Sequence, residues 1–240
     1  MAKTPGKDTP GNPTAGKDIA RKGGQRGLTT QVRKVAGRST GSRAWLQRQL
    51  NDPWVQAAQK AGFRSRAAFK LVQLDEKFAL LKPGQRIVDL GAAPGGWMQV
   101  AARTMGERGR IVGLDLLEID AIPGTIILQG DFQEDAVEQA VIAALDGPAD
   151  LVLSDMAPNT TGHGPTDHLR IMGLAEIALD FAEKVLSPGG AFVAKVFQGG
   201  SEAAMLVRLR RRFASVKHAK PPASRKDSSE LYVVATGFKP

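Results

Sequence analysis

The clearest chemistry in the sequence lies in a run of small residues, Val88-Asp89-Leu90-Gly91-Ala92-Ala93-Pro94-Gly95-Gly96-Trp97. Small residues between an apolar stretch and an amphipathic one permit a tight turn and a close approach of the backbone to a ligand. A dinucleotide site needs G-x-G-x-x-G, but Ala93 takes the place of the second glycine. A P-loop needs a terminal Gly-Lys-Ser/Thr, which is also missing. The pattern D-x-G-x-x-P-G-G favours a loop that binds S-adenosylmethionine (SAM).

Two acidic residues further along the chain suit the same cofactor. SAM carries no phosphate, so its site needs room for an amino-acid tail, an acid for the ribose and an acid for the adenine amino group. Asp115 ends an apolar run about 20 residues after the glycines, where a ribose-binding carboxylate is expected. Asp131 follows the next apolar run and is placed to meet the adenine edge. Both acids could instead cap helices, but their order after the glycine loop favours SAM over a nicotinamide cofactor.

The elements that must position these residues alternate along the chain. The expected strands are 86–90, 110–115, 125–128, 150–154, 191–197, 214–217 and 231–236, and the expected helices are 96–105, 133–145, 168–186 and 201–212. Two further helices are expected within 53–80, with Gly62 between them. Strands that alternate with helices predict a mainly parallel sheet covered on both faces. The last two strands are joined by a polar stretch with no room for a crossover helix, so we expect them to pair as an antiparallel hairpin.

Charge divides the chain into a tail and a domain. The formal net charge is +9, and residues 1–43 hold ten Lys/Arg against Asp8 and Asp18, which places +8 there. Residues 1–42 are expected to form a basic disordered tail, and residues 43–240 one domain. Such a tail suits a polyanion, with RNA as the leading candidate. A solvated extension without a dedicated partner would have the same composition.

Several classes of site are excluded by composition. Cysteine is absent, which removes disulfides, thiolate metal sites and a cysteine nucleophile. No apolar run reaches membrane-spanning length, and the N-terminus lacks the apolar core of a signal peptide. His163 and His168 with Asp167 do not make a metal site. We therefore expect a cytoplasmic protein, monomeric, with no catalytic metal and no membrane contact.

Five longer motifs occur in a fixed order: 63–70, 88–97, 154–159, 195–199 and 229–237. Together they resemble the FtsJ-like ribosomal RNA large-subunit methyltransferases, over roughly residues 43–240. The N-terminal extension departs from that family's pattern. The resemblance implies an α/β Rossmann-like class I SAM-dependent methyltransferase with a seven-stranded, mostly parallel sheet and an antiparallel last strand. It also implies 2′-O-ribose methylation of a uridine in 23S rRNA of the large ribosomal subunit.

The resemblance carries specific residues with it. It implies a catalytic quartet at Lys70, Asp155, Lys195 and Glu230. It implies SAM contacts at Gly95, Trp97, Asp115, Asp131 and Asp155, with Gly91 and Gly96 shaping the same loop.

The quartet makes chemical sense because a ribose hydroxyl is a weak acid and needs a general base. Lys195 follows an apolar run, where burial disfavours a charged amine, so it is the expected base. Lys70 would discourage protonation of Lys195 and stabilise negative charge on the oxygen. Asp155 and Glu230 would orient the lysines but favour the charged amine, and the sequence leaves open which effect dominates.

Other methylation chemistries fit less well. Asp155-Met156-Ala157-Pro158-Asn159 lacks the Asp/Asn-Pro-Pro-Tyr/Phe motif of enzymes that methylate amino nitrogens, and no cysteine is available for uracil carbon methylation. Oxygen methylation is therefore expected. A tRNA or cap ribose methyltransferase, and a non-catalytic RNA-binding ribosome-assembly factor, remain alternatives.

Three groups of basic residues are candidates for RNA contacts. Arg64 and Arg66 precede Lys70 and are expected to meet phosphates. A second group, 208–212, ends a helix and could merely complement its dipole. The third is Arg225 with Lys226. The three tryptophans are scattered and there is one tyrosine, so recognition of RNA shape and backbone is expected rather than base stacking.

Overall fold

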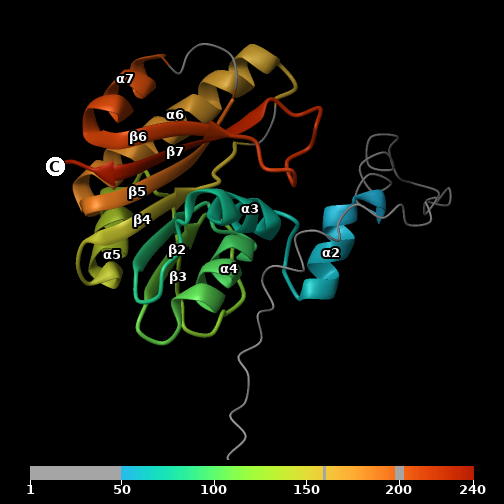
Figure 1. The fold of residues 1–240 in the computed structure, drawn as a ribbon, viewed down its shortest axis with the longest axis horizontal. Coiled ribbons are helices and arrows are strands. Elements are labelled where there is room, and N and C mark those ends of the chain that lie inside the picture. The colour runs from blue at the N-terminus through green and yellow to red at the C-terminus, as the bar shows by residue number, and fades with distance from the viewer. Residues whose placement is uncertain (1–49, 159–160, 198–202) are drawn as a thin grey trace, which may run out of the picture. The chain divides into compact units, whose positions relative to one another are not determined.

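A seven-stranded sheet organises the part of the chain that the computed structural model describes, residues 50–158, 161–197 and 203–240 (Figure 1). The strands are β1 (Arg86–Leu90), β2 (Arg110–Asp115), β3 (Ile126–Gln129), β4 (Ala149–Ser154), β5 (Leu186–Phe197), β6 (Phe213–Ala219) and β7 (Glu230–Phe238). Their order is β3-β2-β1-β4-β5-β7-β6, and β7 runs antiparallel to both of its neighbours. The expected Rossmann-like sheet and the antiparallel final pair are confirmed. The basic tail expected at 1–42 lies outside the described residues.

Helices cover both faces of this sheet. They are α2 (Pro53–Ala61), α3 (Ala68–Phe78), α4 (Gly96–Met105), α5 (Asp135–Leu145), α6 (Gly164–Val185) and α7 (Ala203–Arg212). Helices α3 and α4 pack on one face, and α5, α6 and α7 pack on the other (Figure 1). No helix within the described ranges is long and apolar enough to cross a membrane.

The central strand β4 shows why this sequence forms a two-faced sheet. Leu151 and Leu153 point into the core beneath α3 and α4, whereas Val152 points into the core beneath α5 to α7. All three side chains are fully buried. An uninterrupted apolar run of this kind is typical of a parallel strand covered on both faces.

Two element boundaries differ by more than two residues from the sequence-based expectation. Helix α6 begins at Gly164 rather than 168, because Pro165 is compatible with a first helical turn, where no amide hydrogen is needed. Strand β5 begins at Leu186 rather than 191, although Ser187-Pro188-Gly189-Gly190 has the composition of a turn. Leu186 pairs with Ala149, and the register shifts before the next pair, Leu151 with Ala191. The strand is longer than expected because its first residue pairs with β4, and local composition does not encode such a tertiary contact.

The reversed direction of β7 positions the site. The parallel strands all end at one edge of the sheet, where ligands of open α/β sheets bind. Because β7 is antiparallel, its first residue lies at that same edge, with Glu230 paired to Phe197. Asp115 at the end of β2, Asp155 just after β4 and Glu230 are therefore all carried at one side of the fold.

Helix α6 offers a test of the packing. The Leu179 side chain is fully buried, whereas Leu169 on the same helix is 65% exposed. We predict that Leu179→Ala lowers the free energy of unfolding by about 2–5 kcal/mol, because it leaves a cavity in the core. Leu169→Ala should change it by less than about 0.5 kcal/mol. Urea denaturation of both variants measures the difference, and equal losses would contradict the placement of this helix.

Candidate active site

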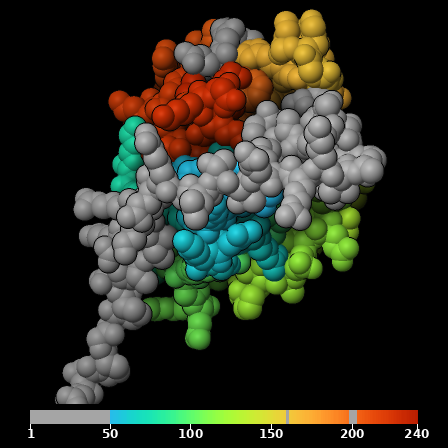
Figure 2. Space-filling model, turned by 90° about the vertical axis from the view of Figure 1, so that its right-hand side faces the viewer, coloured from blue at the N-terminus to red at the C-terminus, as the bar shows by residue number. Residues whose placement is uncertain are grey.

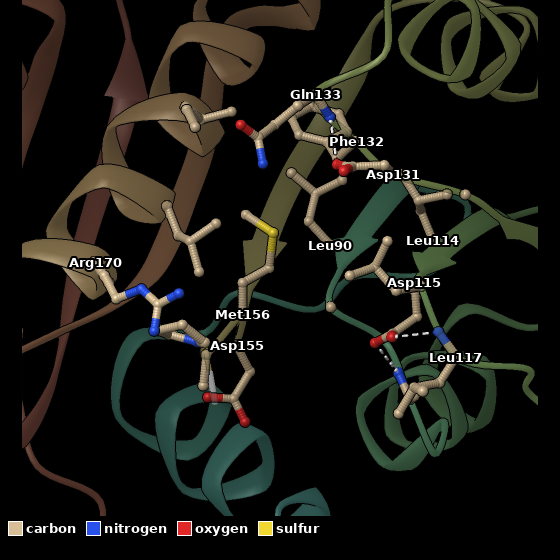
Figure 3. A pocket seen from close by; sticks show the side chains of 18 residues that line it. Leu90, Leu114, Asp115, Leu117, Asp131, Phe132, Gln133, Asp155, Met156 and Arg170 are labelled. Carbon is tan, nitrogen blue, oxygen red and sulfur yellow. Dashed lines mark hydrogen bonds between the residues drawn. The ribbon is translucent and has the colours of Figure 1, made fainter. Parts of the chain in front are cut away.

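A cavity of about 550 Å³ opens at the carboxyl ends of β1, β2 and β4 (Figure 3). Asp115 and Asp131 enter from one side, while Met156 and Arg170 lie on the other, with Leu90 between them (Figure 3). The volume is that of a small-molecule site. Of the predicted SAM contacts, Gly91, Asp115, Asp131 and Asp155 line the cavity.

Gly91 shows how closely the backbone is packed at the floor of the cavity. Its φ is +76°, and a Cβ atom there would lie 2.9 Å from the backbone nitrogen of Met156. Any side chain would therefore collide with the segment that follows β4, in addition to straining the backbone. The sequence-based reading of this position as a turn glycine agrees with both observations.

The two cavity acids are held in place by backbone amides. Asp115 accepts hydrogen bonds from the amides of Ala93 (2.9 Å) and Leu117 (2.9 Å), which orient its carboxylate at the end of β2 (Figure 3). Asp131 accepts one from the amide of Gln133 (2.9 Å). Each carboxylate retains lone pairs for a ligand hydroxyl or amino group.

The remaining residues of the glycine loop have a different place. The Trp97 side chain is 3% exposed, and its Nε1 donates to the Ala67 carbonyl at 2.8 Å. A Cβ on Gly96 would lie 2.6 Å from Ser65 Oγ, and one on Gly95 would lie 2.6 Å from Ile122 Cδ1. None of these three residues lines the cavity. Trp97 bonds α4 to the segment that leads into α3, and the two glycines leave room for close packing there. A cofactor contact at these three positions stays a prediction.

The four residues of the predicted quartet come together beside the cavity. Lys195 Nζ donates to the Asp155 carbonyl oxygen (2.6 Å) and to Asp155 Oδ1 (3.0 Å). Lys70 Nζ lies 2.8 Å from Glu230 Oε2 and 3.7 Å from Asp155 Oδ2. Both lysines are buried. Buried ammonium groups are costly unless they are paired, and here two carboxylates partner them.

Tyr232 is a fifth member that the sequence analysis missed. Its hydroxyl donates to Asp155 Oδ1 at 2.6 Å and accepts from Lys70 Nζ at 2.9 Å. A signal was available, because Tyr232 is the only tyrosine in the chain and stands two residues after Glu230 on one strand, so both point the same way. Burial, with Asp155 and Glu230 nearby, raises the pKa of Tyr232 well above its usual value, so the hydroxyl stays a donor.

A second cavity, of about 390 Å³, lies on the other side of Lys70. Its lining includes Arg66, Lys70, Arg225 and Glu230. Ser224 Oγ donates to Glu230 Oε1 at 2.7 Å, which fixes the carboxylate that holds Lys70. Lys70 and Glu230 therefore face this second cavity, whereas Asp155 faces the first.

The charge state of Asp155 follows from opposing effects. Burial alone would raise its pKa, but Lys195 and Lys70 and the hydrogen bonds from Tyr232 and Lys195 outweigh burial. The net result is a pKa below the ordinary value, so Asp155 is an anion at neutral pH.

Asp89, at the start of the glycine-loop motif, behaves in the opposite way. Its side chain is 1% exposed, and Oδ2 has no hydrogen-bond partner. Burial, followed by repulsion from Asp155 and Asp115, raises its pKa well above 3.8.

Across the described ranges, no group of three or more His, Asp or Glu residues is arranged to hold a metal ion.

Several arginines expected to contact RNA make contacts within the protein, and among them Arg66 donates to the Ala223 carbonyl. Arg64 donates to backbone carbonyls of two loops. Arg208 forms ion pairs with Asp180 and Glu183, which join α7 to α6. The 208–212 cluster is thus in part structural, although Arg210 and Arg211 are exposed.

The buried acid predicts a pH dependence of stability. In the unfolded chain Asp89 ionises near its ordinary pKa of 3.8, whereas the folded protein keeps the proton to higher pH. The native state then binds more protons, so this residue lowers stability as pH rises from about pH 4 upward. We therefore predict that Asp89→Asn becomes more stable relative to the unchanged protein as pH rises. The difference between their free energies of unfolding should stop growing once the pH passes the pKa of Asp89 in the folded protein. Denaturation curves across this range measure it, and a constant difference would mean that Asp89 is ionised in the fold.

Comparisons with known proteins agree with this geometry. Residues 63–238 match the family model of the FtsJ-like methyltransferases. The chain is 61% identical over 220 residues to Ribosomal RNA large subunit methyltransferase E of Acidiphilium cryptum, which covers 91% of this chain and 96% of the relative. It is 60% identical over 222 residues to the protein of the same name from Paramagnetospirillum magneticum, covering 90% and 91%.

A solved structure is similar as well. A Plasmodium falciparum protein assigned as a ribosomal RNA methyltransferase superposes with a TM-score of 0.65 at 30% identity, covering 73% of this chain and 98% of that one. The family model spans the whole sheet, and the two relatives are 60–61% identical over about nine-tenths of this chain. The chain therefore belongs to the FtsJ-like methyltransferase family.

Proposed function

We propose that this methyltransferase uses SAM to methylate the ribose 2′-hydroxyl of a uridine in 23S rRNA of the large ribosomal subunit. The observation that carries the proposal is the position of the lysine–carboxylate cluster. Asp155 lines the first cavity together with Asp115 and Asp131. Lys70 lines the second beside Arg66 and Arg225, and Lys70 Nζ lies 3.7 Å from Asp155 Oδ2.

The first cavity fits SAM by its charge and its walls. Asp115, Asp131 and Asp155 face it together with Arg170. Such a site favours a ligand with an ammonium and a sulfonium group and disfavours a pyrophosphate, which would meet like charges. Asp115 suits the ribose hydroxyls and Asp131 the adenine amino group, while leucine and phenylalanine side chains suit the adenine ring. When bound, SAM supplies an electrophilic methyl carbon.

Lys195 is the residue proposed to receive the proton. SAM bound in the first cavity would give its methyl group to the 2′-oxygen and would be left as a neutral thioether. Lys195 Nζ, which Asp155 holds at two points, would take the hydroxyl proton after its ammonium form has released one proton to solvent. Asp155 therefore determines where the base lies relative to the cofactor cavity.

Lys70 has a complementary role. Its ammonium group stabilises negative charge that grows on the 2′-oxygen. Glu230 and Tyr232 hold Lys70, and Ser224 in turn holds Glu230. This chain of contacts fixes the direction of the ammonium group before substrate arrives.

The second cavity suits the RNA backbone. Arg66 and Arg225 line it beside Lys70, and guanidinium groups match phosphate oxygens in geometry. The relatives from Acidiphilium and Paramagnetospirillum are named as large-subunit rRNA methyltransferases, which supports rRNA as the substrate class.

The first experiment is a transfer assay with methyl-labelled SAM on three substrates: large subunits lacking this methylation, free 23S rRNA and tRNA. We expect label in the large-subunit rRNA, in a dinucleotide that resists alkali, because alkaline cleavage requires a free 2′-hydroxyl. Label only in tRNA would replace the rRNA assignment. SAM binding without transfer to any RNA would favour an assembly factor, and alkali-sensitive label would indicate base methylation.

A variant tests the base. We predict that Lys195→Ala lowers the single-turnover rate by at least about 100-fold, because the hydroxyl proton loses its acceptor. The SAM dissociation constant, measured by calorimetry, should change by less than about threefold. Lys184→Ala is the control, since Lys184 pairs with Glu138 far from the cluster. A normal rate in Lys195→Ala would assign the base elsewhere.

Another variant tests the second cavity. Arg225→Ala should weaken RNA binding and reduce the slope of affinity against salt by about one unit, the signature of one lost phosphate contact. Lys82→Ala removes the same charge from an exposed position just before β1, at the opposite edge of the sheet, and should leave both quantities unchanged. Filter binding at several salt concentrations compares the two. Equal behaviour would show that the cavity does not hold RNA.

A further inference from the structure

Arg64 lies in the short segment between α2 and α3 and bonds to two separate loops. Its Nη1 donates to the carbonyls of Pro94 (3.1 Å) and Asp120 (2.7 Å), and its Nη2 donates to the carbonyl of Ala121 (2.9 Å). Pro94 belongs to the loop between β1 and α4, and the other two belong to the loop between β2 and β3. One guanidinium group therefore joins two loops that the sequence places far apart.

Both of these loops contribute to the lining of the first cavity. Gly91 and Ala93 in one loop, and Asp115 to Leu117 at the start of the other, line its wall. The amide of Ala93 also donates directly to Asp115, so the loops already meet at the cavity. Arg64 ties them together a second time, at the side away from the ligand space.

The surroundings are shaped to admit the guanidinium group. A Cβ on Gly95 would lie 3.0 Å from Arg64 Nη1 and 2.6 Å from Ile122 Cδ1. Glycine at 95 thus leaves the space in which the arginine reaches the second loop. Ile119 and Ile122 are buried in the core, which anchors that loop from below.

The segment that carries Arg64 is itself fixed to α4. The Arg64 amide donates to Gln99 Oε1 (2.8 Å), and Gln99 Nε2 donates back to the Gly62 carbonyl (3.1 Å). In the side view, the light-blue surface of α2 lies between the red surface of the C-terminal strands and the green surface around α4 (Figure 2). Arg66 and Lys70 follow Arg64 closely in the chain, so the same segment continues into the second cavity.

We infer that Arg64 is a positioning residue for the cofactor cavity, which fastens its two loops to the segment bearing Arg66 and Lys70, and that it is not a phosphate contact. The inference rests on the proposed function only in taking SAM as the ligand of that cavity. It replaces the sequence-based expectation that Arg64 and Arg66 act alike. All three acceptors are backbone carbonyls, which a planar fork of donors can reach together and a single ammonium group cannot.

The two roles predict different losses. A phosphate contact contributes to RNA affinity and to its salt dependence. A residue that positions the loops contributes to SAM affinity. Without it the loops are mobile in the unbound protein, and ordering them when SAM binds uses part of the binding free energy. Loss of the guanidinium group should also free the loops in the absence of any ligand.

The test uses the full chain with Arg64→Ala, Arg64→Lys and the control Arg103→Ala. Arg103 donates to the Ala61 carbonyl and stacks on Phe63, so it binds the same segment without touching either loop. Calorimetry with SAM should give a dissociation constant raised about tenfold by Arg64→Ala, or about 1.4 kcal/mol. Arg64→Lys should lie between it and the unchanged protein. RNA affinity and its salt slope, measured without SAM, should change by less than about twofold.

Hydrogen exchange without ligand gives an independent readout. Amides of 91–93, of Gly95 and of 116–122 should exchange faster in both Arg64 variants and not in Arg103→Ala. Weaker RNA binding with a flatter salt slope, together with unchanged SAM affinity and exchange, would overturn the inference. If Arg64→Ala does not fold, Arg64→Lys is judged by the same criteria. Failure of the unchanged protein to bind SAM would count against the proposed function, while the exchange measurement would still decide the role of Arg64.

Discussion

Asp155 is the carboxylate on which two buried ammonium groups converge, and the rest of the site depends on this pairing. It accepts from Lys195 and Tyr232 on one oxygen and lies 3.7 Å from Lys70 on the other. Two buried cations against one anion would be costly, and Glu230 restores the balance by pairing with Lys70. The cluster is stable only when helix α3, the end of β4, and strands β5 and β7 all deliver their side chains to one place. The pairing of these charged side chains therefore restricts how these four elements can be arranged.

The antiparallel strand β7 meets this constraint. A parallel final strand would place Glu230 and Tyr232 at the opposite edge of the sheet from Asp155. Running the strand backwards between β5 and β6 sets Tyr232 directly opposite Lys195 in the ladder. The same arrangement brings the loop before β7, with Ser224 and Arg225, against the start of α3, where Ala223 packs on Phe69. The second cavity is thus lined by segments from near both ends of the described chain, 66–70 and 225–230, whereas the first is lined by residues between Leu90 and Ile177.

Much of this could be predicted from the sequence, and the gaps have physical causes. The alternation of apolar runs predicted the sheet, because strand and helix periods are encoded in local spacing. The quartet was predicted from the family resemblance that the motifs carry. Tyr232 was missed because a tyrosine in an apolar strand has the pattern of a core residue. Arg64 was expected to meet RNA because it precedes Lys70, a predicted catalytic residue, and only the fold shows which carbonyls Arg64 reaches. The early start of β5 depends on pairing with β4, which no local residue pattern encodes.

In the proposed mechanism Lys195 faces the reacting oxygen while Asp155 holds it beside the methyl donor. A crystal structure of the protein with S-adenosylhomocysteine and a short RNA strand would locate all three groups. We expect the adenosyl group in the cavity lined by Asp115 and Asp131, and a ribose 2′-oxygen within about 3 Å of Lys195 Nζ. A 2′-oxygen that meets another side chain, or an adenosyl group bound away from Asp155, would contradict it.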